Sequence, residues 1–186
     1  TGKKAAATDT GVVVGGVLSS LIHSGATAGY SPVPGEYLVK ETAFPRVDSL
    51  LHLPEGQSAL PRNLVLRWAS TPTSVGAESY RLLYSLEDRA IVTGQNLVDA
   101  KEEIDPLNQS PIVPLELDRT GARKFGDGTG RNSGNYMAIH RAGRVQGRTA
   151  VIQSRIERRG QVTMTGRTLQ EARELALTMR GGALPI

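Results

Sequence analysis

The sequence of 186 residues contains no cysteine, only three histidines and few aromatic side chains. The absence of cysteine excludes disulfides, cysteine-ligated zinc and thiol catalysis, but it does not indicate a cellular compartment. Aromatic residues make up 4% of the chain, and no cluster of them accompanies the basic residues to stack on nucleic-acid bases. The longest apolar run, residues 11–22, is far shorter than the roughly 20 residues of a membrane-spanning helix. The sequence therefore predicts no segment that spans a bilayer.

The composition is that of a soluble globular protein with a basic balance. Hydrophobic residues make up 39% of the chain, and 22 lysines and arginines outnumber 18 acidic residues, for a net charge of +4. The length allows one domain, or a domain with an appendage, and a buried core. The excess charge is mostly arginine between Arg119 and Arg180. Because a basic stripe can mark a nucleic-acid footprint, a nucleic-acid or anionic-surface binding module is one hypothesis for the function.

Two regions differ in composition. Residues 1–36 are rich in glycine, alanine, serine and threonine, which predicts a flexible lead-in with one short apolar element. Residues 37–186 are predicted to form a single α+β domain with a mostly antiparallel sheet and a few packed helices. The reason is that strand and helix patterns follow one another without a strict βαβ rhythm.

Apolar–polar alternation predicts the strands of this domain. They are expected at 36–41, 63–70, within 80–94, for much of 99–105, at 112–118 and 160–166, and as two strands within 135–153 that meet near Ala142–Gly143. Loops are expected at 71–79 and 106–111, and the second of these resembles a hairpin connection.

Three segments have helical patterns. The first, 44–53, has Pro45 in its first turn and Thr42 as a possible cap. The second, 119–127, is short. In the third, Thr168 and Glu171 form a capping box, and glycines follow at its end. Its apolar face is predicted from the helical spacing of Leu169, Ala172, Leu175, Ala176 and Met179.

The segment "GDGTGRNSG" (126–134) has the composition of a phosphate-binding loop but not its spacing. A Walker loop needs lysine after its second glycine, and Asp127 stands there when the count begins at Gly121. A dinucleotide loop follows a strand and opens a helix, whereas this segment follows a predicted helix and precedes a strand. It is therefore predicted to be a helix exit and loop.

No other catalytic or metal constellation is evident. "TDTG" (8–11) has the motif of aspartic proteases, but it lies in the lead-in and has no second copy. The histidines, His23, His52 and His140, are far apart and are interpreted as structural. No enzyme activity, cofactor or metal is expected.

The second half of the chain resembles SecD, the membrane subunit of the bacterial Sec protein-export accessory complex. The most specific part is the closing "LALTMRGGALPI", and Gly134 corresponds to a turn glycine of that family. The resemblance is carried, in order, by residues 91–100, 114–145, 150–156, 160–166 and 168–186. It implies the first large periplasmic domain, mainly its head subdomain, with the base subdomain and transmembrane helices outside this fragment.

What the resemblance implies is a non-enzymatic role in export. The domain would hold unfolded preprotein emerging from the SecYEG channel, together with SecF, in movements driven by the proton gradient. It would lie on the periplasmic side of the bacterial inner membrane, attached only through helices absent from this fragment, and would not bind nucleic acid. An edge strand with exposed apolar side chains could accept extended chain. Val145, Val151 and Ile152 are the expected polypeptide-binding residues.

Overall fold

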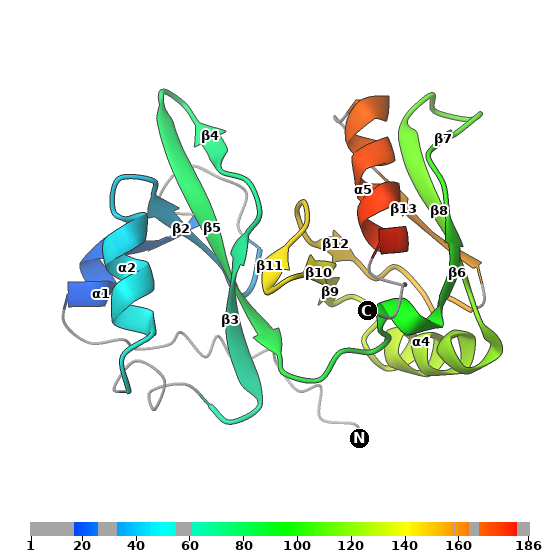
Figure 1. The fold of residues 1–186 in the computed structure, drawn as a ribbon, viewed down its shortest axis with the longest axis horizontal. Coiled ribbons are helices and arrows are strands. Elements are labelled where there is room, and N and C mark those ends of the chain that lie inside the picture. The colour runs from blue at the N-terminus through cyan, green and yellow to red at the C-terminus, as the bar shows by residue number, and fades with distance from the viewer. Residues whose placement is uncertain (1–16, 26–32, 55–60, 158, 164–167, 182–186) are drawn as a thin grey trace, which may run out of the picture. The chain divides into compact units, whose positions relative to one another are not determined.

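The computed structural model describes residues 17–25, 33–54, 61–157, 159–163 and 168–181. It divides the chain into two compact units, the first of residues 1–88 and 143–147 and the second of residues 89–142 and 148–186 (Figure 1). Both units combine helices with mostly antiparallel strands, which confirms the predicted α+β class. The sequence predicted a single domain from residue 37 onward, whereas the structure shares those residues between two units.

The first unit is built on a sheet in which strands lie in the order β1-β2-β5-β3-β11, with β4 also paired to β5. Neighbours are antiparallel, except that β11 runs parallel to β3. Its helices are α1 (Val17–Leu21) and α2 (Phe44–Leu51), and its strands are β1 (Ile22–Ser24), β2 (Glu36–Lys40), β3 (Leu64–Ala69), β4 (Thr73–Val75), β5 (Glu78–Glu87) and β11 (Arg144–Val145). Its buried core consists of Leu18, Val39, Val47, Leu51, Trp68 and Leu83.

The apolar element predicted in the lead-in is present as α1 and β1. Leu18 of α1 is buried in the core, and β1 pairs with β2 over three residues. Residues 17–24 are therefore part of the first unit's sheet and core. The "TDTG" segment (8–11) lies outside the described residues.

Helix α2 forms where the sequence predicted it, but its cap differs. Pro45 lies in the first turn as expected, because a proline there gives up only a backbone N–H that has no helical partner. Ala43 is the N-cap and makes no side-chain hydrogen bond, so the expected cap at Thr42 is wrong. Val47 and Leu51 face the core.

The loop predicted at 71–79 contains the short strand β4. Gly76 has a φ of 62°, which allows the chain to reverse between β4 and β5. Thr73–Val75 then pair with Glu78–Tyr80. The hairpin depends on this single left-handed glycine.

The second unit contains a sheet of order β13-β8-β6, with β7 also paired to β8, and a separate two-stranded ribbon of β9 and β12. Its elements are η2 (Gly94–Asn96), β6 (Leu97–Ala100), β7 (Glu103–Ile104), β8 (Pro111–Leu117), α4 (Arg119–Arg131), β9 (Tyr136–Met137), β10 (His140–Arg141), β12 (Ala150–Val151), β13 (Arg159–Thr163) and α5 (Leu169–Gly181). Its core includes Ala100, Val113, Leu115, Leu117, Phe125, Ala172, Leu175 and Ala176.

Strand β8 contains Pro114 although it is the central strand. The amide of Lys101 donates to Pro114 O at 3.2 Å, so the side of Pro114 that lacks an N–H faces the gap between β6 and β7. A proline removes one hydrogen bond of a ladder, and the interruption of strand pairing at 101–102 coincides with it. The predicted strand at 99–105 is thus confirmed in two pieces, joined to β8 by the predicted hairpin connection.

Helix α4 is longer than the sequence predicted. It runs through most of the glycine segment, to Arg131, although glycine is a poor helix former. Close packing explains two glycines of this helix, because at Gly121 and Gly128 α4 lies too close to its neighbours for a side chain to fit. A Cβ at Gly121 would lie 2.5 Å from Asn96 Cβ, and one at Gly128 would overlap Ile91.

The two ends of α4 have ordinary caps. The amide of Gly121 donates to Asp118 Oδ1 at 2.6 Å, and this hydrogen bond lowers the pKa of Asp118. At the other end, Asn132 Nδ2 donates to Gly128 O at 2.9 Å, and Gly134, with a φ of 86°, turns the chain into β9. The segment 126–134 is therefore mainly the second half of a helix and its exit.

Helix α5 begins with the predicted capping box. Thr168 N donates to Glu171 Oε2 at 2.8 Å, and Glu171 N donates to Thr168 Oγ1 at 3.2 Å. Leu175 is buried and Met179 is partly buried against the same core, as predicted. Leu169 is exposed, so its assignment to the apolar face is wrong; it stands at the first helical position, ahead of the turns that contact the sheet.

The segment 135–153 forms four short strands instead of two. The expected turn at Ala142–Gly143 is confirmed, with positive φ at both residues. The strands on either side of this turn, β10 and β11, are each two residues long. Strands β9 and β12 form their own ribbon, and β11 joins the sheet of the first unit.

Candidate polypeptide-binding surface

The expected binding residues do not all lie in one unit. Val145 belongs to the first unit, and Val151 and Ile152 belong to the second. Val145 is fully buried and pairs with Ala69 of β3, and its carbonyl accepts from Ser70 N at 2.8 Å. Its side chain is therefore inaccessible to a guest chain, contrary to the expectation that it would offer an apolar contact at a sheet edge.

Ile152 is also occupied by the protein itself. Its side chain is 2% exposed. Its amide donates to Asn135 O, and its carbonyl accepts from Gly134 N, both at 2.8 Å. Ile152 therefore anchors the ribbon to the loop that follows α4, and its side chain is unavailable to a ligand.

Val151 has the opposite orientation. Its side chain is 49% exposed, and its cross-strand neighbour Tyr136 is 39% exposed. Directly opposed residues of an antiparallel pair place their side chains on the same face. Together they form a small apolar surface, called here the Tyr136–Val151 pair.

The backbone of Val151 is also directed outward. The N–H and C=O of one residue point to the same side of an antiparallel strand, and successive residues alternate. Since Ile152 directs both groups toward residues 134–135, Val151 directs both of its groups away from β9. Within the described residues, the ribbon has no third strand on that side.

The sequence did not indicate Tyr136. Tyr136 forms part of this apolar surface only because the strand register places it opposite Val151. Strands of two residues are too short for their sequence pattern to reveal the register. Among the described residues of the second unit, the other large hydrophobic side chains that are exposed lie outside the ribbon and are Val98, Ile104, Leu107, Leu169 and Leu177.

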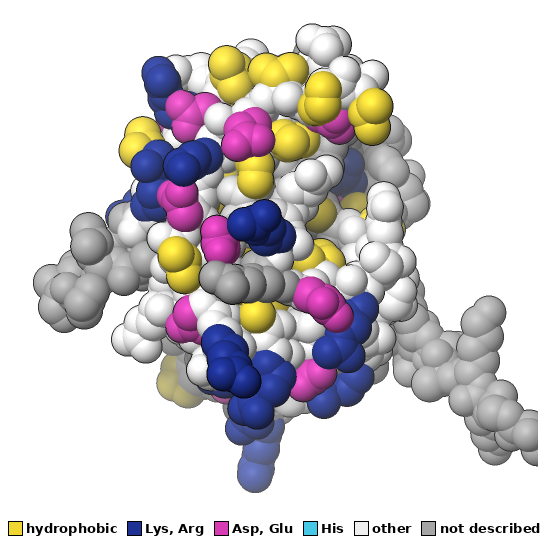
Figure 2. Space-filling model, turned by 90° about the vertical axis from the view of Figure 1, so that its right-hand side faces the viewer, with side chains coloured by type: hydrophobic (Ala, Val, Ile, Leu, Met, Phe, Trp, Pro, Cys, Tyr) yellow, Lys and Arg dark blue, Asp and Glu magenta, His cyan; other side chains and the backbone are white. Residues whose placement is uncertain are grey.

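Charges on the second unit are mixed in sign. Lys101 Nζ lies 2.8 Å from Asp99 Oδ2, and this hydrogen bond lowers the pKa of Asp99. Arg173 Nε lies 2.9 Å from Glu102 Oε1. Figure 2 shows basic and acidic side chains interspersed on one face, with hydrophobic side chains gathered toward the end where α5 and the β7–β8 hairpin lie in Figure 1. This face is not a field of a single sign.

The three histidines lie on different elements or loops. His52 and His140 are exposed, and His23 is half-buried in β1. His52 Nδ1 lies 2.7 Å from Asp48 O and 3.7 Å from Asp48 Oδ1. Among the described residues, no cluster of three potential ligands could hold a metal ion, and no helix in that part of the chain is long and apolar enough to cross a membrane.

Known proteins resemble this chain over its second half and part of its first half. The family model described as SecDF, P1 head subdomain, matches residues 71–186. The protein translocase subunit SecD of Desulfurispirillum indicum is 38% identical over 128 residues, which cover 68% of this chain and 24% of that protein. SecD of Aquifex aeolicus is 42% identical over 102 residues, or 55% of this chain and 20% of the relative. The chain thus spans about a quarter of the length of these curated relatives.

A solved structure is also similar. The membrane component SecDF, described as enhancing protein export, is 25% identical, with a TM-score of 0.44 over 82% of this chain and 63% of the other. The family match covers the second unit and β4, β5 and β11 of the first. Since the matched residues make up more than half of the sequence, this chain belongs to the SecDF family and carries its P1 head subdomain.

Proposed function

We propose that this domain is a non-enzymatic part of a protein-export accessory subunit and that it binds unfolded polypeptide weakly at the Tyr136–Val151 pair. The observation that carries the proposal is the coincidence, at one residue, of an exposed apolar side chain and outward backbone groups. An extended chain can hydrogen-bond to Val151 as an added strand while an apolar side chain contacts Tyr136. Such contacts recognise backbone and general apolarity, and therefore accept many sequences.

The family supplies the setting of this proposal. The full-length protein would receive preprotein leaving the SecYEG channel, act together with SecF, and use the proton gradient to prevent backsliding. The domain would lie on the periplasmic side of the bacterial inner membrane. Its dissociation constant for polypeptide should be about micromolar or weaker, because a transport domain must release its cargo. A micromolar dissociation constant corresponds to about 8 kcal/mol of binding free energy.

Titration of a labelled, unfolded, uncharged peptide tests the proposal. We expect Val151→Ser to weaken binding, because it removes the exposed apolar side chain but leaves the fold intact. Val98→Ser is the matched control, since Val98 is an exposed valine on β6, away from the ribbon. Equal weakening by both variants would contradict the assignment to the ribbon.

The salt dependence of binding distinguishes this function from the alternative, a basic module that binds nucleic acid or an anionic surface. Contacts to nucleic-acid phosphates weaken steeply with salt because counterions are released, whereas capture of apolar chain changes little. Tight oligonucleotide binding with a steep salt dependence, together with no peptide binding, would overturn the export proposal.

A further inference from the structure

The first unit contains a hollow of about 570 Å³ beside strand β3. Its apolar lining includes Leu51 at the end of α2, Leu66 and Trp68 of β3, and Leu83 of β5. Most of the lining precedes residue 71 and therefore lies outside the family match. The hollow belongs to the first unit, whereas the Tyr136–Val151 pair belongs to the second.

The hollow follows an unpaired edge of β3. On one side β3 pairs with β5 from Leu64 to Trp68, but on the other side β11 pairs only with Trp68 and Ala69. No described strand occupies that second side between Leu64 and Arg67. A stretch of four residues is about 13 Å long, enough for a short guest strand.

Hydrogen bonds show which backbone groups face this edge. Asp88 N donates to Asn63 O on the β5 side, and Ser70 N donates to Val145 O on the β11 side. By alternation, Leu64 and Leu66 direct their backbone groups toward the unpaired edge. The amide of Leu64 is used in a turn to Pro61 O, so the groups facing the hollow are the two carbonyls and the amide of Leu66.

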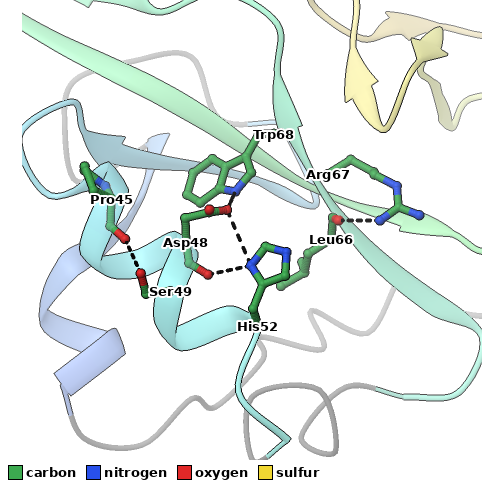
Figure 3. Close-up of polar contacts among 7 residues, drawn as sticks. All are labelled: Pro45, Asp48, Ser49, His52, Leu66, Arg67 and Trp68. Atoms are coloured by element: carbon green, nitrogen blue, oxygen red, sulfur yellow. Dashed lines mark hydrogen bonds and ion pairs between the residues drawn. The ribbon is translucent and has the colours of Figure 1, made fainter.

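Arg67 covers one of these groups. Its Nη1 donates to Leu66 O at 3.2 Å (Figure 3). A guest amide can replace this contact, which would release the guanidinium to pair with an anion on the guest. In a complex of this kind, Arg67 would couple strand addition to recognition of negative charge.

The charged side chains that line the hollow are all basic or potentially basic, namely His52, Arg62 and Arg67, and no carboxylate is among them. The nearby Asp48 is engaged elsewhere. It accepts from Trp68 Nε1 at 2.7 Å and lies beside His52 (Figure 3). An apolar hollow with a cationic rim complements a ligand with apolar and acidic groups.

We propose that this hollow binds an extended peptide segment with acidic and apolar side chains, which adds to β3 as a strand. The inference rests on the proposed function for its ligand class, polypeptide, and adds a second site that selects by charge. Backbone pairing with Leu64 and Leu66 supplies the extended conformation, and Arg62 and Arg67 supply the preference for carboxylates.

The test uses the whole chain and two labelled peptides that differ only by aspartate-to-asparagine exchange. We expect the acidic peptide to bind about fivefold more tightly at low salt, as two exposed ion pairs would allow. The preference should shrink as salt screens the charges. The double variant with Arg62→Gln and Arg67→Gln should bind the acidic peptide only as tightly as it binds the neutral one. Arg46→Gln, an exposed arginine of α2 that does not line the hollow, should leave the preference unchanged.

A second measurement addresses the strand itself. Two versions of the acidic peptide are methylated at alternate backbone amides, one at the odd-numbered and one at the even-numbered residues. Only one of these two sets supplies the N–H groups that pair with the carbonyls of β3, so only one version should lose the preference for the acidic peptide.

Equal affinity of the acidic and neutral peptides, or a preference that survives the double arginine variant, would overturn this site while leaving the proposed function intact. Loss of all peptide binding in the Val151→Ser variant would also overturn the site beside β3 while leaving the proposed function intact. If the unsubstituted protein bound no peptide at all, both the proposed function and this second site would be overturned. Displacement of the acidic peptide by an oligonucleotide at equal charge concentration would show an unspecific anion site instead.

Discussion

Gly128 of α4 lies directly against the side chain of Ile91, so closely that a Cβ at position 128 would overlap it. Helix α4 can approach this segment only because residue 128 has no side chain. Glycine in a helix interior costs about 1 kcal/mol relative to alanine, and the close packing offsets that cost here.

We expect Gly128→Ala to destabilise the domain by about 1–3 kcal/mol, the usual range for overpacking, although alanine is the better helix former. Gly130 is the matched control in the same helix. A Cβ there would lie 3.6 Å from Arg155 Cγ, an ordinary contact, so Gly130→Ala should stabilise by up to about 1 kcal/mol. Urea unfolding measures both, and a stabilising Gly128→Ala would contradict the packing explanation.

A second prediction concerns Thr129, which is fully buried. Its Oγ1 donates to Phe125 O at 2.7 Å and accepts from Ile156 N at 2.9 Å. Thr129→Val keeps the shape but leaves the Ile156 amide without its partner, at a cost of about 1–3 kcal/mol. Hydrogen exchange at Ile156 should accelerate in this variant.

Thr129→Ser is the control for this hydrogen bond. It retains the hydroxyl and loses one methyl group, worth about 0.8 kcal/mol. Exchange at Ile156 should then change only as much as global stability does. Equal acceleration in both variants would show that the hydroxyl does not protect this amide.

The sequence predicted elements whose pattern is local. Strand β8 alternates over seven residues and α5 has both a capping box and a helical apolar spacing, so both were evident without a partner. The extent of α4 was not, because glycine propensity predicts an earlier end, whereas the close approach of Gly128 to Ile91 is a contact that the local sequence does not reveal.

The candidate site was predicted only in part, for a related reason. Val145, Val151 and Ile152 look alike in sequence, but pairing with β3 buries the first and the ribbon buries the third. Which valine remains exposed depends on partners that are distant in the chain. The binding role of Val151 stays a prediction, and Tyr136 joins it because of the register.

The third prediction compares two leucines of α5. Leu175 is buried in the core of the second unit, so Leu175→Ala should destabilise by about 2–5 kcal/mol. Leu177 is exposed, and Leu177→Ala should change the free energy of unfolding by less than about 0.5 kcal/mol. Thermal or urea unfolding measures the difference. Similar losses in both variants would mean that α5 buries a different face.

The last prediction concerns the pH dependence that the N-cap of α4 confers. The hydrogen bond from Gly121 N lowers the pKa of Asp118 below its ordinary value of 3.8, with a smaller contribution from Asn96. A carboxyl whose pKa is lower in the folded state stabilises the fold fully above the unfolded pKa. That contribution is lost as the pH falls through the folded value.

Asp118→Asn separates the charge from the cap, because asparagine also caps helices well but does not titrate. At neutral pH the original protein should be the more stable of the two. Its advantage should begin to decline as the pH falls below about 5, where the unfolded carboxylate starts to take up its proton, and should be lost once the pH passes below the lowered pKa of folded Asp118. Urea unfolding of both proteins across that range measures the decline. If the difference in unfolding free energy stayed constant with pH, the Asp118 carboxylate would not be the group that couples the stability of α4 to protons.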